Sequence, residues 1–233
     1  MFSYLKFPLT AILMFQMFSG CNEDSVNSVD NDSTKPIGNG TLSYNGFTYK
    51  TVVIGTQEWT VENLRTKKYN DGTEITNITD NNAWMTANSG ARCANDNNEG
   101  TVATYGYLYN WYAVNTGKLA PAGWRVATDA DWTKLINFVG GGSTAGTKLK
   151  AKSGWFNNKN GTDEYGFNAL PGGGRSGDSG LFSSLESSGG WWSSSSYGAT
   201  LAWNRNIYYY DNGVYRSSYY QRGGFSVRLV RDK

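Results

Sequence analysis

The sequence predicts an α+β domain that is rich in strands and loops, and three observations lead to this prediction. Aromatic residues make up 15% of the 233 residues, charged residues only 17%, and glycines number 29. Such a composition favours strands and turns over long helices. One segment in the middle of the chain has the spacing of an amphipathic helix, and the last third has the pattern of strands around a hairpin turn.

The charge and the histidine count limit the functions that we expect. The formal net charge is only +2, which gives no electrostatic reason to expect a nucleic-acid partner. Histidine is absent from the sequence. This absence excludes the Ser/His and Cys/His catalytic pairs, the usual histidine ligands of zinc and the commonest general base. An enzyme with this sequence would have to work without imidazole.

The first residues predict an exported lipoprotein. Lys6 precedes an apolar run over residues 7–18, which is too short to span a bilayer as a helix, and Ser19-Gly20-Cys21 follows it. This arrangement resembles a bacterial lipoprotein signal, so residues 1–20 are the expected signal peptide and Cys21 the expected lipid carrier. An ordinary secretory signal with an incidental cysteine is the alternative. Residues 22–25 (NEDS) resemble the acidic patch that sends Bacteroidetes-type lipoproteins to the cell surface, which predicts a surface-exposed outer-membrane protein.

Residues 21–40 are expected to form a disordered, lipidated tether. Residues 22–39 contain almost no apolar side chains, so burial cannot offset the entropy of ordering them. One folded domain is then expected over residues 41–233, which is long enough to bury a core. Cys93 is the only other cysteine, so we expect no disulfide within this domain.

The first part of the domain predicts strands and then a short helix. Residues 47–64 concentrate β-branched and aromatic residues on both sides of Gly55-Thr56, which predicts two strands joined by a turn. In residues 107–114 the spacing of Leu108, Trp111 and Tyr112 is that of one helical face.

The clearest predicted helix begins after Thr128. This residue can cap the helix, and Asp131 stands at the capping-box position three residues later. The apolar residues that follow have helical spacing, and a run of three glycines over residues 140–142 ends the helix. They are Trp132, Leu135, Ile136 and Val139.

A long region over residues 143–190 predicts loops broken by short strands, because it is rich in Gly, Ser and Asn. Within it Gly172-Gly173-Gly174-Arg175 could suggest a phosphate cradle, but no Lys-Ser/Thr follows. We therefore expect a tight turn there, with Arg175 as a structural anchor for neighbouring loops.

The C-terminal part predicts strands over residues 191–195, 201–210 and 225–230. Asp211-Asn212-Gly213 predicts the turn of a hairpin, and with Asn212 and Gly213 at its centre Tyr210 would lie opposite Tyr215. Strand alternation then places an uncharged set of side chains on one face. The set is Asn206, Tyr208, Tyr210, Tyr215, Ser217 and Tyr219, and Arg205, Ile207, Tyr209, Arg216 and Tyr220 lie on the other face.

Six separated motifs resemble one known family in their order and spacing. They are YKTVVIGTQEWTVENL (49–64), YGYLYNWYAV (105–114), PAGWRVATDADWTKL (121–135), GFNALPGGGR (166–175), WWSSS (191–195) and GFSVRLVRD (224–232). The family is the Fibrobacter succinogenes major paralogous domain, and the resemblance covers residues 41–233. The second half also resembles the C-type-lectin-like superfamily, including its formylglycine-generating branch. This resemblance implies a C-type-lectin-like α+β fold with two helices packed on small antiparallel sheets and a long loop region.

The sequence departs from the family pattern at three positions. Members often have Cys at the positions of Ala120 and Leu229, a pair that the resemblance implies to be bridged. Loss of both cysteines is consistent with one disulfide replaced by apolar packing. Ala127 stands where the family usually has Pro before the helix cap.

The first functional hypothesis is a non-catalytic binding or adhesion module for extracellular polysaccharide or a protein partner. Aromatic side chains supply apolar contact area with a polar rim. Tyr208, Tyr210, Tyr215 and Tyr219 are the candidate ligand-binding residues of the hairpin, and Trp155 is the candidate in the long loop region. Five other tryptophans are expected to belong to the core, namely Trp59, Trp111, Trp124, Trp132 and Trp192.

The alternative is an enzyme. A formylglycine-generating enzyme needs a pair of thiolates, which one cysteine cannot supply. A carboxylate-based hydrolase could use acidic residues of the domain, although nothing in the sequence orients them into a pair. The candidates are Asp129, Asp131, Asp163, Glu164 and Asp178.

Calcium is the one cofactor for which the sequence offers candidate ligands, and otherwise we expect none. Asn95, Asp96, Asn98 and Glu99 offer side-chain oxygens in a short run. The Asp-x-Asp-x-Asp-Gly spacing and the sugar-binding motifs of calcium-dependent lectins are missing, so a solvated Asn-rich loop is the alternative.

Overall fold

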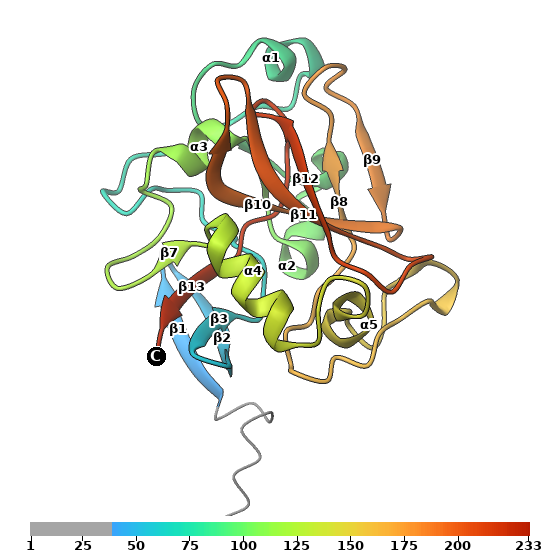
Figure 1. Cartoon of the computed structure of the whole chain (residues 1–233). Coiled ribbons are helices and arrows are strands. Elements are labelled where there is room, and N and C mark those ends of the chain that lie inside the picture. Colours follow the sequence, from blue (N-terminus) through green and yellow to red (C-terminus); the bar gives the residue numbers. More distant parts are fainter. Residues whose placement is uncertain (1–38) are drawn as a thin grey trace, which may run out of the picture. The chain divides into compact units, whose positions relative to one another are not determined.

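The computed structural model of the protein describes residues 39–233. The predicted signal peptide, Cys21 and almost all of the predicted tether lie outside these residues. The first strand begins at Asn39, two residues before the predicted start of the domain. Mixed α/β structure follows, in which strands predominate (Figure 1). Within the described residues no helix is both long and apolar enough to cross a membrane.

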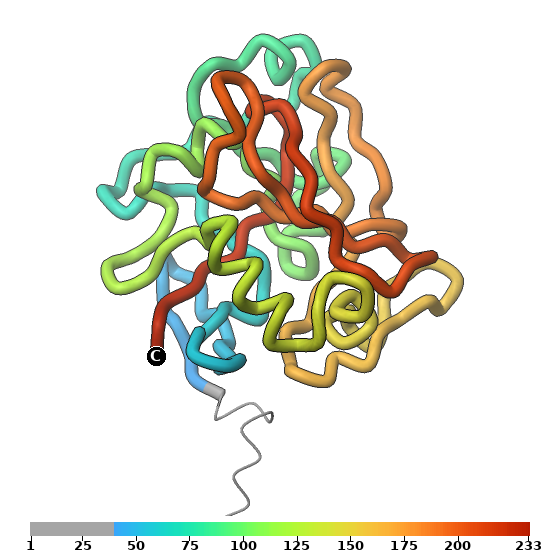
Figure 2. The backbone as a smooth tube through the Cα atoms, viewed as in Figure 1, coloured from blue at the N-terminus to red at the C-terminus, as the bar shows by residue number. Residues whose placement is uncertain are grey.

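The first sheet joins the two ends of the domain. Its strands run in the order β1 (Asn39–Tyr44), β2 (Phe47–Ile54), β3 (Gln57–Thr60), β13 (Leu229–Asp232) and β7 (Arg125–Val126), and all neighbours are antiparallel. The predicted turn at Gly55-Thr56 is confirmed, with Gly55 at φ 61°. Figure 2 shows the C-terminal strand beside the N-terminal strands.

The second sheet carries the candidate site. Its order is β12 (Tyr215–Tyr220), β11 (Leu201–Tyr208), β10 (Ser188–Tyr197), β8 (Gly172–Arg175) and β9 (Phe182–Leu185). A third, small sheet contains β4 (Thr76–Asn77), β5 (Ala91–Cys93) and β6 (Leu108–Tyr109). The expectation of antiparallel sheets is wrong for these two, because β8 pairs with β10 and β4 with β5 in parallel.

The central helix is confirmed as predicted. Helix α4 (Asp129–Phe138) begins with a capping box, in which Thr128 and Asp131 each accept a hydrogen bond from the other's main chain. Gly140 and Gly141 adopt φ of 113° and 90°, which ends the helix.

The expectation of two helices is wrong, because the described residues contain five α-helices, four of them very short. The others are α1 (Asn81–Thr86), α2 (Val102–Tyr105), α3 (Trp111–Asn115) and α5 (Ala145–Leu149), with 3-10 turns η1 (Asn95–Asn97), η2 (Glu99–Thr101) and η3 (Phe156–Asn158). The predicted helix over residues 107–114 begins only at Trp111, since Asn110 caps α3 by accepting a hydrogen bond from Ala113. Leu108 belongs to strand β6 instead.

The C-terminal hairpin is confirmed in its faces but not in its register. Asn206, rather than Tyr210, lies opposite Tyr215, and Asn204, rather than Tyr208, lies opposite Ser217. The register therefore differs by four residues, an even number, so each side chain keeps its predicted face. Residues 209–214 form a longer tip than the expected turn. The last predicted strand is shorter as well, because Phe225 and Ser226 form only isolated bridges before β13 begins at Leu229.

Aromatic side chains dominate the core. Trp59, Trp132, Trp191 and Phe167 pack ring against ring with centroid distances of 5.0–6.2 Å. Of the tryptophans expected in the core, Trp59, Trp111, Trp132 and Trp192 are buried, whereas Trp124 is only partly buried. Ala120 and Leu229 are both buried in the same apolar cluster.

A buried arginine connects the first sheet to the long loop region. The Arg228 guanidinium donates to Asn63 Oδ1 and to the carbonyl oxygens of Thr60, Phe167 and Asn168 at 2.6–3.0 Å. Its charged plane lies 4.6 Å from the centre of the Phe167 ring. Burial lowers the pKa of Arg228, but a guanidinium remains protonated in proteins, so the surrounding oxygens stabilise a charge.

Candidate functional site

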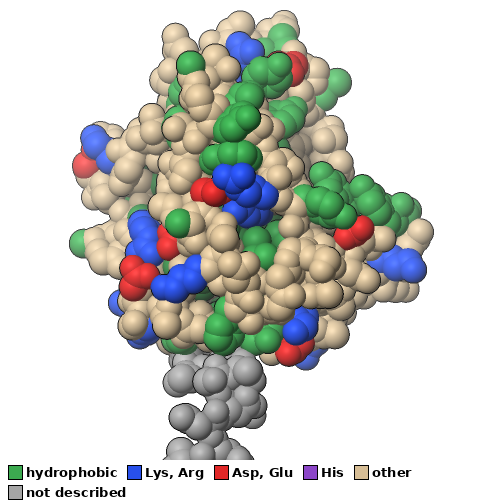
Figure 3. Space-filling view, viewed as in Figure 1, with side chains coloured by type: hydrophobic (Ala, Val, Ile, Leu, Met, Phe, Trp, Pro, Cys, Tyr) green, Lys and Arg blue, Asp and Glu red, His purple; other side chains and the backbone are tan. Residues whose placement is uncertain are grey.

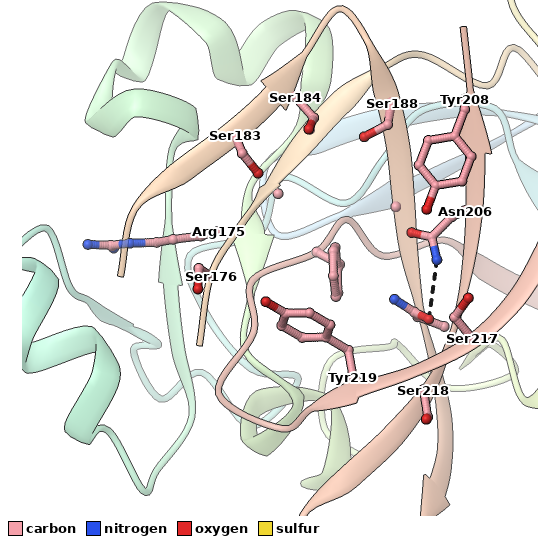
Figure 4. A pocket seen from close by; sticks show the side chains of 15 residues that line it. Arg175, Ser176, Ser183, Ser184, Ser188, Asn206, Tyr208, Ser217, Ser218 and Tyr219 are labelled. Atoms are coloured by element: carbon pink, nitrogen blue, oxygen red, sulfur yellow. Dashed lines mark hydrogen bonds between the residues drawn. The ribbon is translucent and has the colours of Figure 1, made fainter. Parts of the chain in front are cut away.

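A polar pocket lies on the face of the second sheet. Its volume is about 260 Å³. Figure 4 shows that the side chains around it come from several strands. Small and polar residues line it almost throughout. They are Gly173, Gly174, Arg175, Ser176, Ser183, Ser184, Ser188, Gly190, Asn204, Asn206, Tyr208, Ser217, Ser218, Tyr219 and Phe225.

Glycines create the depth of this pocket. A β-carbon on Gly190 would lie 2.6 Å from Phe225 Cδ1, and one on Gly174 would lie 2.9 Å from Phe225 Cε1. Both distances are far below an ordinary contact, so the Phe225 ring can occupy its place only because these two strand positions have no side chain. The ring packs edge-on against Trp192 and Tyr219. Phe225 therefore adds an apolar ring to the pocket, beside the rings of Tyr208 and Tyr219.

The hairpin of β11 and β12 provides one wall. Asn204 lies directly opposite Ser217, so both side chains belong to the same face of the hairpin. Asn206 lies two residues along that face, and its amide nitrogen is 3.4 Å from Asn204 Oδ1. Tyr208 and Tyr219 continue the same face and are half-buried. Hydroxyl and amide groups, which both donate and accept hydrogen bonds, thus line this wall.

The pocket presents a neutral surface. Arg175 is its one charged lining residue, and Figure 4 shows the guanidinium pointing away from the hollow. The guanidinium donates to the carbonyl oxygens of Ile78, Thr79 and Gly180 and stacks between the rings of Trp84 and Phe182. The predicted structural role of Arg175 is confirmed. The predicted tight turn is wrong, because residues 172–175 form strand β8.

The four predicted tyrosines lie on one face, and all four are at least partly accessible. Tyr208 and Tyr219 line the pocket, whereas Tyr210 is 68% and Tyr215 42% exposed. Tyr210 stacks on Tyr208 with ring centres 5.4 Å apart. Figure 3 shows hydrophobic side chains gathered at the tip of the β11–β12 hairpin, with acidic and basic side chains beside them.

The structure places Trp155 in the core instead of on the surface. Its side chain is 3% exposed, and its indole nitrogen donates to the Ala169 carbonyl at 3.0 Å. Lys150 Nζ lies 5.0 Å from the ring centre. As a correction, Trp155 leaves the set of ligand-binding candidates, because its ring is covered by neighbouring residues.

The candidate catalytic carboxylates lie outside the pocket and in different places. Asp129 accepts hydrogen bonds from Arg205 and Arg216, and Asp131 accepts them from Arg125 and Thr128. Burial raises the pKa of both carboxyl groups, but these hydrogen bonds outweigh it and hold each pKa below its ordinary value. Both acids are therefore ionised and paired.

The other three acidic candidates, Asp163, Glu164 and Asp178, contact different residues. Asp163 accepts a hydrogen bond from the Asn168 main chain, and burial raises its pKa. Glu164 lies 4.0 Å from Lys148, and Asp178 lies 3.8 Å from Arg222. Each of these three carboxylates thus has a different partner.

Cys93 is buried in the small cluster with Trp84, Ala91 and Leu108. Desolvation raises the pKa of its thiol to about 11, so the reactive thiolate is disfavoured at neutral pH.

The calcium candidates point to different partners. The Asn95 amide donates to the Gly172 carbonyl, Asn98 Oδ1 accepts from Gly100, and Glu99 accepts from Tyr107. Asp96 is exposed. Over residues 39–233 no group of three or more Cys, Asp or Glu side chains is arranged to hold a metal ion.

Sequence reasoning placed Asn206 and Ser217 on the face of the tyrosines but missed the pocket residues of the other strands. Ser176, Ser183, Ser184 and Ser188 come from the long region that predicts loops, and only the sheet topology brings them near Asn206. The paired glycines at residues 173–174 and 189–190 are the available signal. Glycine inside a strand marks a place where another group approaches closely.

Comparison with known proteins gives one match. The model of the family described as Fibrobacter succinogenes major domain matches residues 52–231. No curated protein and no solved structure matches the chain.

Proposed function

This chain belongs to the Fibrobacter succinogenes major domain family, and from its pocket we propose that it is a non-catalytic binding module for extracellular glycans. The observation that carries this proposal is the neutral lining of the pocket, in which serine hydroxyls and asparagine amides lie beside the aromatic rings of Tyr208, Tyr219 and Phe225. Sugars present hydroxyl groups and apolar C–H faces, which such a lining can hydrogen-bond and pack against.

The size of the pocket supports a small ligand group. Its volume of about 260 Å³ is just below the roughly 300–1,000 Å³ of pockets that enclose drug-sized ligands. One sugar ring suits this space better than a long segment of a chain. A protein partner, the second kind of ligand, could enter with an equally small polar side chain.

Binding is a better account of the pocket than hydrolysis. A glycoside hydrolase places two carboxylates on either side of the bond that it cleaves, roughly 5–10 Å apart. None of the five acidic candidates lines the pocket. Three of them are instead paired with Arg205, Arg125 and Lys148. We therefore propose a ligand-binding role without chemistry on the ligand.

We also propose a fold and a cellular location for the domain. The motifs around Thr128 and in the last strand support a C-type-lectin-like fold. Cys21 and the acidic residues after it support a lipid anchor at the surface of the outer membrane, and multiple acyl chains would hold the protein there stably. A tethered module that binds glycans would serve adhesion or capture of polysaccharide.

The test is binding of the full-length protein in detergent to a glycan array and to insoluble polysaccharides, with calcium and with a chelator. The structure offers a matched pair of variants. Asn206→Ala removes an amide from the pocket, whereas Asn82→Ala removes one from an exposed position on α1. We expect binding that falls about tenfold in Asn206→Ala, as loss of one or two hydrogen bonds implies, and stays unchanged in Asn82→Ala. Absence of binding to every glycan, or equal binding by both variants, would contradict the proposal.

A further inference from the structure

Three tyrosines at the edge of the pocket form a continuous aromatic surface, which we call the tyrosine platform. It consists of Tyr208, Tyr210 and Tyr215. The rings of Tyr208 and Tyr210 are stacked, with an interplanar angle of 12° and centres 5.4 Å apart. The ring of Tyr215 is tilted by 56° and lies 5.6 Å from that of Tyr208. Since Tyr210 is 68% exposed, part of its ring is free to contact a ligand.

The platform and the pocket form one surface. Tyr208 belongs to both, because it lines the pocket beside Asn206 (Figure 4) and stacks on Tyr210 at the hairpin tip. A ligand group seated in the pocket would therefore have an aromatic surface next to it. The pocket alone is too small for a chain, whereas pocket and platform together offer room for several linked groups.

The hairpin tip that carries the platform is fastened to helix α5. The buried Lys150 ammonium donates to the carbonyl oxygens of Asp211 at 2.7 Å and Tyr209 at 3.3 Å. Thr147 donates from its main chain to the Asn212 carbonyl and from its hydroxyl to Asn212 Oδ1. These bonds fix the tip before any ligand arrives, which lowers the entropy that binding must offset.

The charge beside the platform favours neutral ligands. Hydrogen bonds from the Gly213 main chain and the Tyr215 hydroxyl lower the pKa of Asp211. Its carboxylate is therefore negative at neutral pH and would repel the carboxylate of an acidic sugar. Lys150 is buried below the tip, where its charge is directed to carbonyl oxygens.

We propose that the ligand is a linear, uncharged oligosaccharide chain, with one sugar ring in the pocket and the next rings against Tyr210 and Tyr215. This inference rests on the proposed function and adds chain length and charge to it. Sugar rings stack their C–H faces on tyrosine, and a platform that continues from the pocket adds contacts for each further ring.

The experiment measures the affinity of the full-length protein for sugars of increasing length. The probes are the mono-, di-, tetra- and hexasaccharides of the cello-, xylo-, malto- and manno- series, with hexagalacturonate as the acidic comparator. For at least one neutral series we expect an affinity that rises about tenfold or more from the monosaccharide to the hexasaccharide, through added aromatic stacking. Hexagalacturonate should bind more weakly than the neutral hexasaccharide.

Variants separate the platform from the pocket. Tyr210→Ala should remove most of the length-dependent gain and change monosaccharide binding by less than about twofold, and Tyr197→Ala, a change at another exposed tyrosine, should have no effect. In Lys150→Met the rise of affinity with chain length should also disappear, while monosaccharide binding is retained. A melting curve checks that this variant is folded. Asn206→Ala should weaken binding at every length.

The outcomes distinguish this inference from the proposed function. If a neutral sugar binds with the same affinity at every length, or if Tyr210→Ala weakens the monosaccharide as much as the hexasaccharide, the chain-binding inference is overturned and the glycan-binding function stands. If hexagalacturonate binds more tightly than the neutral chains, the charge preference is overturned. If no sugar binds the unaltered protein, the proposed function and this inference both fail.

Discussion

Single buried charges hold distant parts of this protein together. Arg175 and Arg228 are each 1% exposed, and each donates several hydrogen bonds to main-chain carbonyl and amide oxygens. Arg175 joins strand β8 to the loop before α1, and Arg228 joins the last strand to residues 167–168 and to the end of β3. Because a buried carbonyl that loses its donor costs free energy, each of these arginines stabilises two segments at once.

Arg228→Met should lower the free energy of unfolding by about 3 kcal/mol or more, since it removes a donor from four buried or half-buried acceptors. One of them, Asn63 Oδ1, keeps a second donor, Trp191 Nε1. Arg222→Met changes an arginine whose side chain is 41% exposed and whose nearest carboxylate is 3.8 Å away, and it should cost less than about 1 kcal/mol. Urea unfolding of both variants measures the difference. Equal stability of the two variants would show that the Arg228 contacts contribute little.

The Asp129 carboxylate should make stability depend on pH. Burial raises its pKa, but hydrogen bonds from Arg216 and Arg205 outweigh burial, so its pKa in the folded protein is lowered. Its contribution is therefore fully present above its unfolded pKa of about 3.9 and is lost as the pH falls through the folded value. Urea unfolding at a series of pH values from neutral to acidic should show a smaller loss of stability for Asp129→Asn than for the unaltered protein. The same loss in both proteins would contradict this role.

At the scale of elements, the glycine-bearing strands and the hairpin together shape the site. Strands β8 and β10 provide the floor because they place glycines where side chains would otherwise fill the hollow. Strands β11 and β12 provide the polar and aromatic side chains that form a wall of the pocket. The pocket therefore depends on the absence of β-carbons in one pair of strands and on the length of the side chains in the other.

Gly190→Ala should disturb the pocket, because the added β-carbon would lie 2.6 Å from Phe225 Cδ1. Displacement of the ring should cost about 1–3 kcal/mol of stability and abolish glycan binding. Gly142→Ala is the control, since the nearest atom to its added β-carbon is 3.7 Å away. Melting temperature and binding are measured for both. Normal binding by Gly190→Ala would mean that the ligand does not use this floor.

Local signals in the sequence predicted helix α4 and the faces of the hairpin correctly. The capping box of Thr128 and Asp131 lies within one helical turn, and strand alternation depends only on neighbouring residues. The hairpin register could not be predicted, because Lys150 and Thr147, about sixty residues earlier, hold its tip open. The glycine run at 172–174 appeared to be a turn for a similar reason, since Phe225, which requires the glycine at position 174, is distant in the sequence.

At the scale of the whole molecule, two five-stranded sheets and a three-stranded sheet pack around aromatic cores. Most of the candidate site belongs to the second sheet, and Ser176 and Phe225 complete it from outside the strands of that sheet. The chain connects the sheets through Trp191 and Trp192 of β10, which are buried in different clusters. Because neighbouring strand residues point to opposite faces, these two tryptophans bury both faces of β10 there, and Gly190, two residues before Trp192, borders the pocket. The tyrosines were predictable from alternation, whereas the pocket depends on a sheet order that the sequence does not reveal.

The most direct test of this account is an NMR titration of the full-length protein in detergent with the neutral oligosaccharides, following the main-chain amide signals. We expect shifts of the amide signals around the pocket and the platform, in residues 173–176, 183–190 and 204–219. Shifts confined to another hollow, such as the one lined by Tyr112, Thr200 and Arg222, would contradict the assigned site. No shift with any neutral oligosaccharide would contradict glycan binding itself.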